Sequence, residues 1–157
     1  MNYAGWLVWG FAGTIVLTIL MSFSQAFHMT RMNIPYILGM IVTPDRDRAR
    51  LAGIFMHMAN GWILSLLYIA AFHQWDGPAW WKGAVIGFTH ASFLLVTMPI
   101  FPSLHPRMAD ETYGPTVVRQ LEPPGFLALN YGIQTPVSII LSHIVFGIIL
   151  GTFYKMP

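Results

Sequence analysis

The sequence contains no cysteine and very few charged residues. The absence of cysteine excludes disulfides, thiolate metal ligands and cysteine nucleophiles. Charged residues make up 9% of the 157 positions, whereas soluble domains contain roughly 25%. All acidic residues lie between the long apolar runs, at Asp45, Asp47, Asp76, Asp110, Glu111 and Glu122. Because 55% of the residues are hydrophobic, we predict an integral membrane protein in contact with the lipid bilayer.

Four apolar runs are long enough to span a bilayer, which requires about 20 helical residues. They belong to predicted helices at about residues 6–27, 44–72, 83–101 and 137–154. The first turns of the second helix, which carry Asp45 and Asp47, are expected to project into water before the apolar run begins. The run at residues 33–42 is too short to span, so we expect a short interfacial or re-entrant helix there. Thr43 precedes Pro44 and Asp45, a pattern that predicts Thr43 as the N-cap of the second span. The predicted fold is a single all-α membrane domain, residues 1–157.

An internal repeat relates the two halves of the chain. Three residues of the second run recur 86 positions later in the fourth: His57 and His143, Gly61 and Gly147, Tyr68 and Tyr154. Residues of the first run recur 77 positions later in the third, among them Val8 and Val85, Gly10 and Gly87, His28 and His105. We therefore predict two tandem helical hairpins, about residues 1–76 and 77–157, which enter the membrane in the same direction as parallel repeats.

The basic residues predict the orientation of the chain in the membrane. The connections after the first and third runs carry Arg31, Arg46, Arg48, Arg50, Arg107 and Arg119. The opposite side carries only Lys82 and Lys155. By the positive-inside rule, both connections are cytoplasmic and both termini lie outside the cytoplasm. The net charge of +2 and the lack of a basic stripe give no reason to expect nucleic-acid binding.

The second connection, about residues 103–129, is unusually long, and long loops in compact domains are often functional. It carries His105, Arg107 and Glu122. We interpret it as a loop that is either solvated or docked on a partner, because ordinary loops are polar and surface-exposed. The alternative is that its acids Asp110, Glu111 and Glu122, beside His105 and Arg107, support hydrolysis at the membrane surface.

Small residues predict where helices approach one another closely. Gly10, Thr14, Thr18, Ser22 and Gln25 share one face of the first run, which we expect to contact another helix rather than to line a polar pathway. Packing is also the preferred role for the glycines of the spans, at Gly10, Gly13, Gly61, Gly83, Gly87, Gly147 and Gly151.

Three histidines within the spans are the candidate functional residues, because ionisable groups at this depth commonly mark functional sites. At about 1.5 Å per residue, His57 and His143 lie roughly 10 Å inside the cytoplasmic edge, whereas His90 is expected in a separate environment nearer the outer edge. The symmetric pair is a candidate haem or copper site, with Met56, Met58 and His90 as further metal-ligand candidates. We favour a packing role, in which each histidine donates a hydrogen bond across a close helix contact.

Enzymatic motifs are absent. The sequence has no phosphate-binding loop, no Gly-x-Ser-x-Gly segment and no His-Glu-x-x-His segment. No carboxylate lies within a span, which argues against a di-iron carboxylate site. We therefore expect a protein without enzymatic activity.

Two segments resemble patterns in small four-helix bacterial inner-membrane proteins of unknown function: His57-Met58-Ala59-Asn60-Gly61 and Ser142-His143-Ile144-Val145-Phe146-Gly147. The resemblance covers most of the chain and implies four spans in a bacterial inner membrane, without an activity or cofactor. We expect an accessory or structural subunit that packs against other membrane subunits or against itself. The alternatives are a haem- or copper-binding protein that uses His57 and His143, and a small transporter.

Overall fold

The computed structural model describes all 157 residues as helices joined by turns and loops, with no strand. The helices long and apolar enough to cross a membrane are α1 (Tyr3–Ala26), α3 (Arg46–Gln74), α4 with its continuation (Trp80–Leu104) and α6 (Thr135–Phe153). The continuation consists of η1 (Met98–Ile100) and α5 (Phe101–Leu104), which follow α4 proper (Trp80–Thr97). Two further helices are α2 (Ile34–Val42) and η2 (Phe126–Tyr131). The predicted all-α class and the four apolar spans are confirmed.

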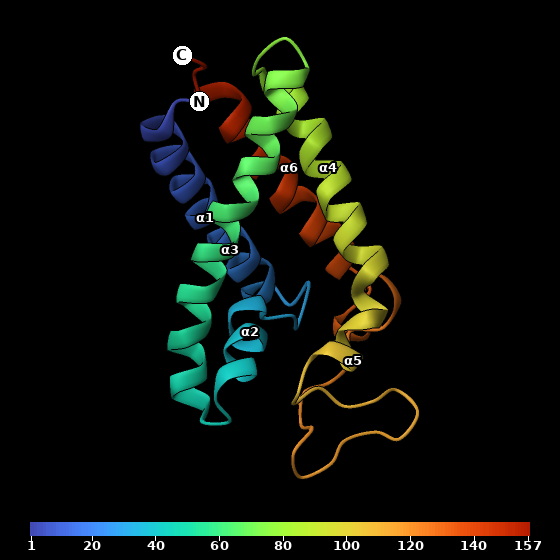
Figure 1. The fold of residues 1–157 in the computed structure, drawn as a ribbon. Helices are drawn as coiled ribbons and strands as arrows, with labels where there is room; N and C mark the ends of the chain where they lie inside the picture. Colours follow the sequence, from blue (N-terminus) through green and yellow to red (C-terminus); the bar gives the residue numbers. More distant parts are fainter.

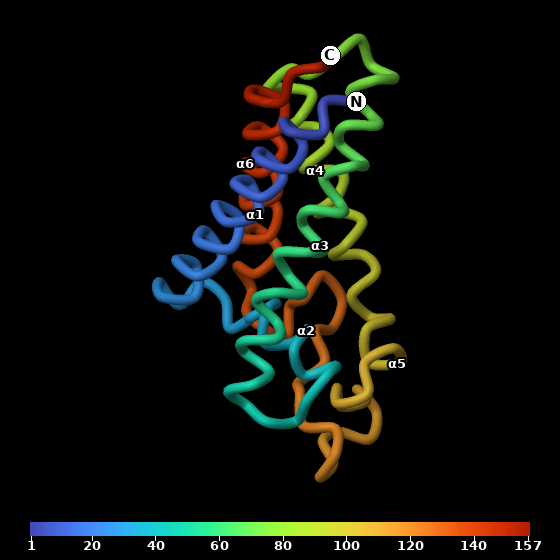
Figure 2. Tube along the Cα trace, turned by 60° about the vertical axis from the view of Figure 1, so that its left-hand side comes forward, coloured from blue at the N-terminus to red at the C-terminus, as the bar shows by residue number.

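Both termini lie at one end of the molecule, beside the turn that joins α3 to α4 (Figures 1 and 2). The backbone N–H of Asn2 donates to the Tyr154 hydroxyl at 3.1 Å, and the Asn2 side chain donates to the Lys155 carbonyl at 3.0 Å. The opposite end holds α2, the first turns of α3 and the long connection between α5 and α6. We call these the terminal end and the arginine end, because the second carries all six arginines.

Side-chain caps fix where the helices begin. Asn2, Asn33 and Asp45 each accept a hydrogen bond from a backbone N–H three residues later, as N-cap residues do. The prediction of Thr43 as the N-cap of α3 is wrong. The backbone N–H of Thr43 donates to Gly39 at the end of α2, so this residue terminates one helix and Asp45 begins the next.

Glycines set the closest helix contacts. A methyl group on Gly83 would overlap with the backbone carbonyl of Gly147, and the reverse is equally true, so α4 and α6 touch through their backbones. Between α1 and α3, Gly61 of α3 accommodates the Thr14 side chain of α1, and Gly10 of α1 faces Ser65. The remaining predicted glycines also lie at helix contacts: Gly13 against Phe146, Gly87 against His143, and Gly151 against Ala79.

The short helix α2 packs lengthwise against the first turns of α3, beyond the end of α1 (Figure 2). Two further glycines form this contact: Gly39 faces the carbonyl of Ala49, and Gly53 faces the carbonyl of Pro35. Neither glycine is among the predicted packing residues, because the sequence pattern places α2 at the membrane interface without a partner helix. Its interfacial or re-entrant character stays a prediction.

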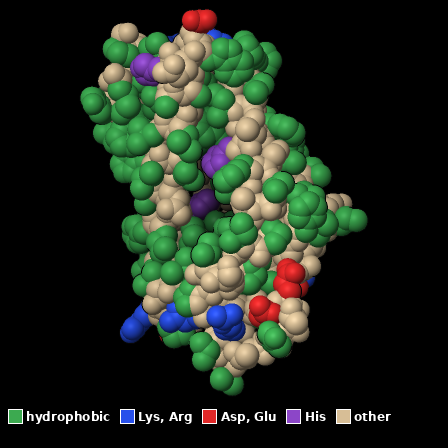
Figure 3. All heavy atoms as spheres, turned by 45° about the vertical axis from the view of Figure 1, so that its right-hand side comes forward, with side chains coloured by type: hydrophobic (Ala, Val, Ile, Leu, Met, Phe, Trp, Pro, Cys, Tyr) green, Lys and Arg blue, Asp and Glu red, His purple; other side chains and the backbone are tan.

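The bundle buries aromatic and aliphatic side chains between its helices and exposes other apolar side chains on its outer surface. Tyr68, Phe72, Phe146 and Leu150 are fully buried in one cluster. Large apolar side chains face outward from every span, including Phe23, Phe55, Leu67 and Phe93. Apolar side chains cover the middle of the molecule and charged ones gather at its ends (Figure 3). This distribution matches a bundle surrounded by lipid.

We expect the Gly147→Ala substitution to destabilise the bundle by roughly 1–3 kcal/mol, because the added methyl group must push α4 and α6 apart. The measurement is the unfolding midpoint in mild detergent. Ala59→Leu is the control. Ala59 is exposed on α3, so the larger side chain adds volume outside any helix contact. Equal midpoints for wild type and Gly147→Ala would show that the backbone contact is not tight.

Candidate functional site

A cavity of about 420 Å³ lies inside the bundle, with walls contributed by α1, α2, α3, α4 and α6. Three of the four histidines of the spans border it: His57 from α3, His90 from α4 and His143 from α6, whereas His73, in the last turn of α3, does not. Most of the remaining wall is apolar, with Leu17, Leu64, Leu94, Ile139 and Phe146 among its residues. Histidine side chains are visible at the bottom of a hollow between α3 and α4, which diverge from their connecting turn (Figures 1 and 3).

His90 lies beside His143, with ring centroids 4.9 Å apart and one ring edge-on to the other. The prediction of a separate environment for His90 is therefore wrong. Counting residues gives the depth of a side chain only if the helix is perpendicular to the membrane, and it contains no information on how closely α4 and α6 pack. Gly87, almost one helical turn before His90, faces the backbone of His143, and this contact brings the two imidazoles to the same level.

The protein leaves several imidazole nitrogens without a partner. His90 Nδ1 is hydrogen-bonded to the Tyr68 hydroxyl at 3.0 Å, and His143 Nδ1 is 2.8 Å from the carbonyl oxygen of Ile139. Both Nε2 atoms and both nitrogens of His57 make no hydrogen bond within the protein. None of these four atoms is sealed from its surroundings, because the only fully buried unpartnered side-chain atoms are Trp62 Nε1 and Ser138 Oγ. Of the three histidines, only His90 has a hydrogen bond across a helix contact, with Tyr68 of α3.

The polar face of α1 divides into two parts. Near the terminal end, Gly10 and Thr14 contact α3, as predicted for the whole face. Farther along, Thr18, Ser22 and Gln25 border the cavity instead, because α1 no longer touches α3 there. The Thr18 and Ser22 hydroxyls donate to backbone carbonyls one turn earlier at 2.7 and 2.9 Å. Their oxygen lone pairs remain as acceptors toward the cavity.

The candidate metal ligands do not converge on one point. Met56 and Met58 do not border the cavity, since residues adjacent to His57 on a helix point in other directions. No three His, Asp or Glu side chains come close enough to hold a metal ion together. The three histidines share a cavity but do not form a ready-made coordination sphere.

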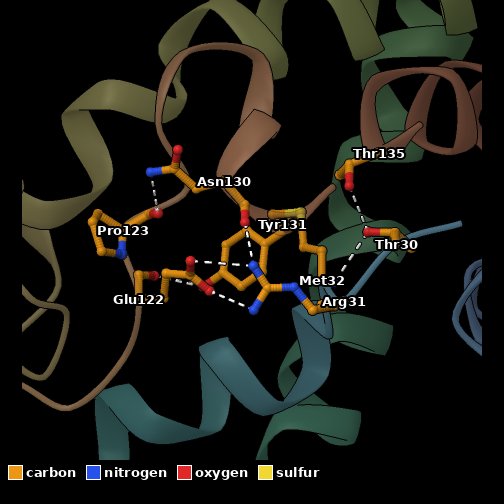
Figure 4. A network of polar contacts seen from close by, with 8 residues as sticks. All are labelled: Thr30, Arg31, Met32, Glu122, Pro123, Asn130, Tyr131 and Thr135. Atoms are coloured by element: carbon orange, nitrogen blue, oxygen red, sulfur yellow. Dashed lines mark hydrogen bonds and ion pairs between the residues drawn. The ribbon is translucent and has the colours of Figure 1, made fainter. Parts of the chain in front are cut away.

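At the arginine end, Arg31 ties the α1–α2 connection to the long connection (Figure 4). Its guanidinium contacts the Glu122 carboxylate at 3.0 Å, and its backbone N–H donates to the Tyr131 carbonyl at 2.8 Å. The Tyr131 hydroxyl donates to the Glu122 carbonyl at 2.6 Å. Beside this group, the Thr30 and Thr135 hydroxyls lie 2.8 Å apart and are buried. We call Arg31, Glu122 and Tyr131 the latch.

His105 and Arg107 bind carbonyls of α2, and Arg107 caps its C-terminal end. His105 is buried, and its Nε2 lies 2.9 Å from the Ile37 carbonyl oxygen. The Arg107 guanidinium donates to the carbonyls of Met40 and Ile41, the latter at 3.0 Å. Cations at a helix C-terminus are stabilising. The three residues assigned to a docking loop, Glu122 included, therefore engage this chain itself.

No protein family matches this chain, and neither curated proteins nor solved structures show a detectable similarity to it. The cavity and its residues are therefore the features that indicate a function.

Burial, followed by the nearby Glu122 charge, raises the pKa of Tyr131 to about 12, compared with roughly 10 for an exposed phenol. Keeping this phenol neutral contributes to the free energy of unfolding below about pH 10, and the contribution is lost as the pH rises through about 12. The reason is that the phenol of the unfolded chain, with the lower pKa, releases its proton at lower pH than the folded one. We expect the tyrosinate absorbance of wild type and Tyr131→Phe to coincide up to about pH 11. Glu122→Gln should lower this pKa without returning it to the ordinary value, since burial is the larger cause. A difference between wild type and Tyr131→Phe near pH 10 would contradict the buried environment.

Proposed function

We propose that the protein binds an amphiphilic molecule from the bilayer in the histidine cavity, without transforming it. The observation that carries this proposal is the set of unpartnered imidazole nitrogens beside apolar walls. A polar group left unpaired in an apolar environment costs about 1–3 kcal/mol by mutational measurements. A ligand with a polar group and a hydrocarbon part satisfies both kinds of surface, and the hollow between α3 and α4 gives it a route from the lipid.

Binding fits the cavity better than catalysis. No acidic residue borders it, and its one charged residue is Arg50, near the start of α3. Arg50 lies 3.5 Å from Asp47 on the same helix. No serine or threonine hydroxyl of the cavity wall is hydrogen-bonded to a histidine, so no nucleophile has an adjacent base.

A transport function is less well supported, because close helix contacts fill the half of the bundle toward the terminal end. Gly83 meets Gly147 there, and Gly151 meets Ala79. The rings of Trp6 and Trp62 lie with centroids 5.9 Å apart in the other hairpin. A substrate would need these contacts to separate in order to cross.

For the setting of the protein, we propose a bacterial inner membrane with the arginine end in the cytoplasm and both termini outside. The arginine distribution supports this orientation by the positive-inside rule.

A second candidate function, an accessory subunit of a larger membrane complex, is supported by the tip of the long connection. Tyr113 and Val117 are 87% and 89% exposed there, beyond the apolar middle of the molecule, and Val118 is also exposed. The tip is an ordered turn, because the Asp110 carboxylate accepts the backbone N–H groups of Thr112 and Tyr113. Exposed apolar side chains on an ordered loop are typical of a protein contact.

We expect protein extracted gently from its own membrane to retain a stoichiometric amphiphile, detected as a mass increment by native mass spectrometry. Leu64→Trp fills the cavity and should reduce this occupancy at least about tenfold, a 1.4 kcal/mol effect. Leu67→Trp is the matched control, since it places the same ring on the exposed face of α3. An empty wild-type cavity would overturn the proposal. A Soret band or stoichiometric metal in the absorption and metal analyses would replace it with the haem or copper alternative.

A Val117→Cys variant tests the orientation and the subunit role together, because the chain has no other cysteine. We expect a membrane-impermeant maleimide to label it only in inverted vesicles, and a cysteine-linked photo-crosslinker to join it reproducibly to one membrane polypeptide. Met156→Cys, at the terminal end, should be labelled from the outside of intact spheroplasts. Labelling of position 117 from outside would reverse the topology, and the absence of any crosslink would count against a partner at this loop.

A further inference from the structure

The hydrogen bond of His143 fixes which of its nitrogens carries the proton. Its Nδ1 lies 2.8 Å from the carbonyl oxygen of Ile139, one turn earlier on α6. A carbonyl oxygen can only accept, so Nδ1 must donate. In the neutral imidazole, Nε2 then carries a lone pair and no proton. His143 therefore presents an acceptor that no protein group uses.

Tyr68 fixes the opposite arrangement on His90. Tyr68 is fully buried, and its hydroxyl has one side-chain partner, His90 Nδ1, at 3.0 Å. An edge-on contact with Phe146, at 5.1 Å between centroids, holds the phenol ring in place. If Nδ1 carried the proton, the buried hydroxyl hydrogen would have no acceptor, an arrangement that buried hydroxyls avoid. The hydroxyl therefore donates to Nδ1, and His90 Nε2 carries a proton and is a free donor.

An unused donor and an unused acceptor thus belong to two imidazoles whose centroids are 4.9 Å apart, and both side chains border the cavity. On the basis of the proposed function, we infer that the cavity selects an amphiphile with an uncharged hydroxyl group. The hydroxyl oxygen accepts from His90 Nε2–H, and the hydroxyl hydrogen is donated to His143 Nε2. Tyr68 is a positioning residue, because it acts through the tautomer of His90.

Other polar groups leave part of this pair unsatisfied. A ketone, quinone or ether accepts a hydrogen bond but cannot donate one to His143. An ammonium group donates but cannot accept from His90, and a carboxylate cannot donate. The walls near the two imidazoles carry no charged side chain, since Arg50 is the only one that borders the cavity and lies toward the arginine end. Two ligand sources share the required chemistry: a long-chain or isoprenoid alcohol, and the ring hydroxyl of a quinol.

The test measures binding of matched probes to the protein in phosphatidylcholine nanodiscs. Farnesol is compared with farnesyl methyl ether, and a short-chain prenylated benzoquinol with its benzoquinone. In each pair the hydroxyl compound should bind at least about tenfold more tightly, the effect of one buried acceptor left unpaired. The pair with the larger ratio identifies the source. In His143→Leu the preference for farnesol over its ether should vanish, whereas a purely steric effect of the extra methyl group would persist.

Nitrogen-15 spectra of histidine-labelled protein test the tautomers directly and do not depend on any ligand. We expect a protonated Nε2 on His90, a protonated Nδ1 on His143, and a shift in the His90 tautomer population in Tyr68→Phe. The opposite tautomer on either ring, or equal binding of alcohol and ether by wild type, would overturn this inference while leaving an amphiphile-binding cavity intact. Failure of every probe to bind, together with an empty cavity in native membranes, would overturn the proposed function itself.

Discussion

A polar atom inside a bilayer must find its hydrogen-bond partner within the protein, because the hydrocarbon offers none. This constraint explains most of the polar groups in the four spans. Backbone groups are paired within the helices, and the hydroxyls of Thr14, Thr18 and Ser22 donate to carbonyls one turn earlier. Trp62 Nε1 and Ser138 Oγ are buried exceptions. The other exceptions that share one place are four nitrogens of His57, His90 and His143, all at the cavity. These nitrogens make the cavity the candidate site.

The shape of the bundle follows from where its helices can touch. Toward the terminal end, glycines let backbones meet, as at Gly83 with Gly147. Toward the arginine end, α3 diverges from α4 and leaves a volume of about 420 Å³. The same close contact that seals one end also places His90 beside His143, because Gly87 faces the His143 backbone. The close packing of α4 against α6 therefore both brings the helix backbones together and places His90 beside His143.

The arginine end is held together by its own polar residues. The latch joins the α1–α2 connection to the long connection, His105 is hydrogen-bonded to the middle of α2, and Arg107 caps the end of that helix. The Arg31–Glu122 pair is exposed, and such pairs contribute only about 0–1 kcal/mol. The buried contacts, including the Thr30–Thr135 hydrogen bond, therefore contribute more to the order of this end. The loop tip around Val117 stays exposed to another protein.

The sequence by itself determined the four spans, the helical class and the glycines at helix contacts, because hydropathy and residue size act locally along each helix. It also singled out His57, His90 and His143, since ionisable residues are conspicuous in apolar runs. Tertiary structure alone decided which helices are neighbours, and hence that His90 meets His143, that α2 packs on α3 through Gly39 and Gly53, and that Arg107 caps α2. Counting residues along separate helices gives neither the tilt of each helix nor the identity of its neighbours. The tilt and the neighbours of the helices are what bring three histidines to one cavity.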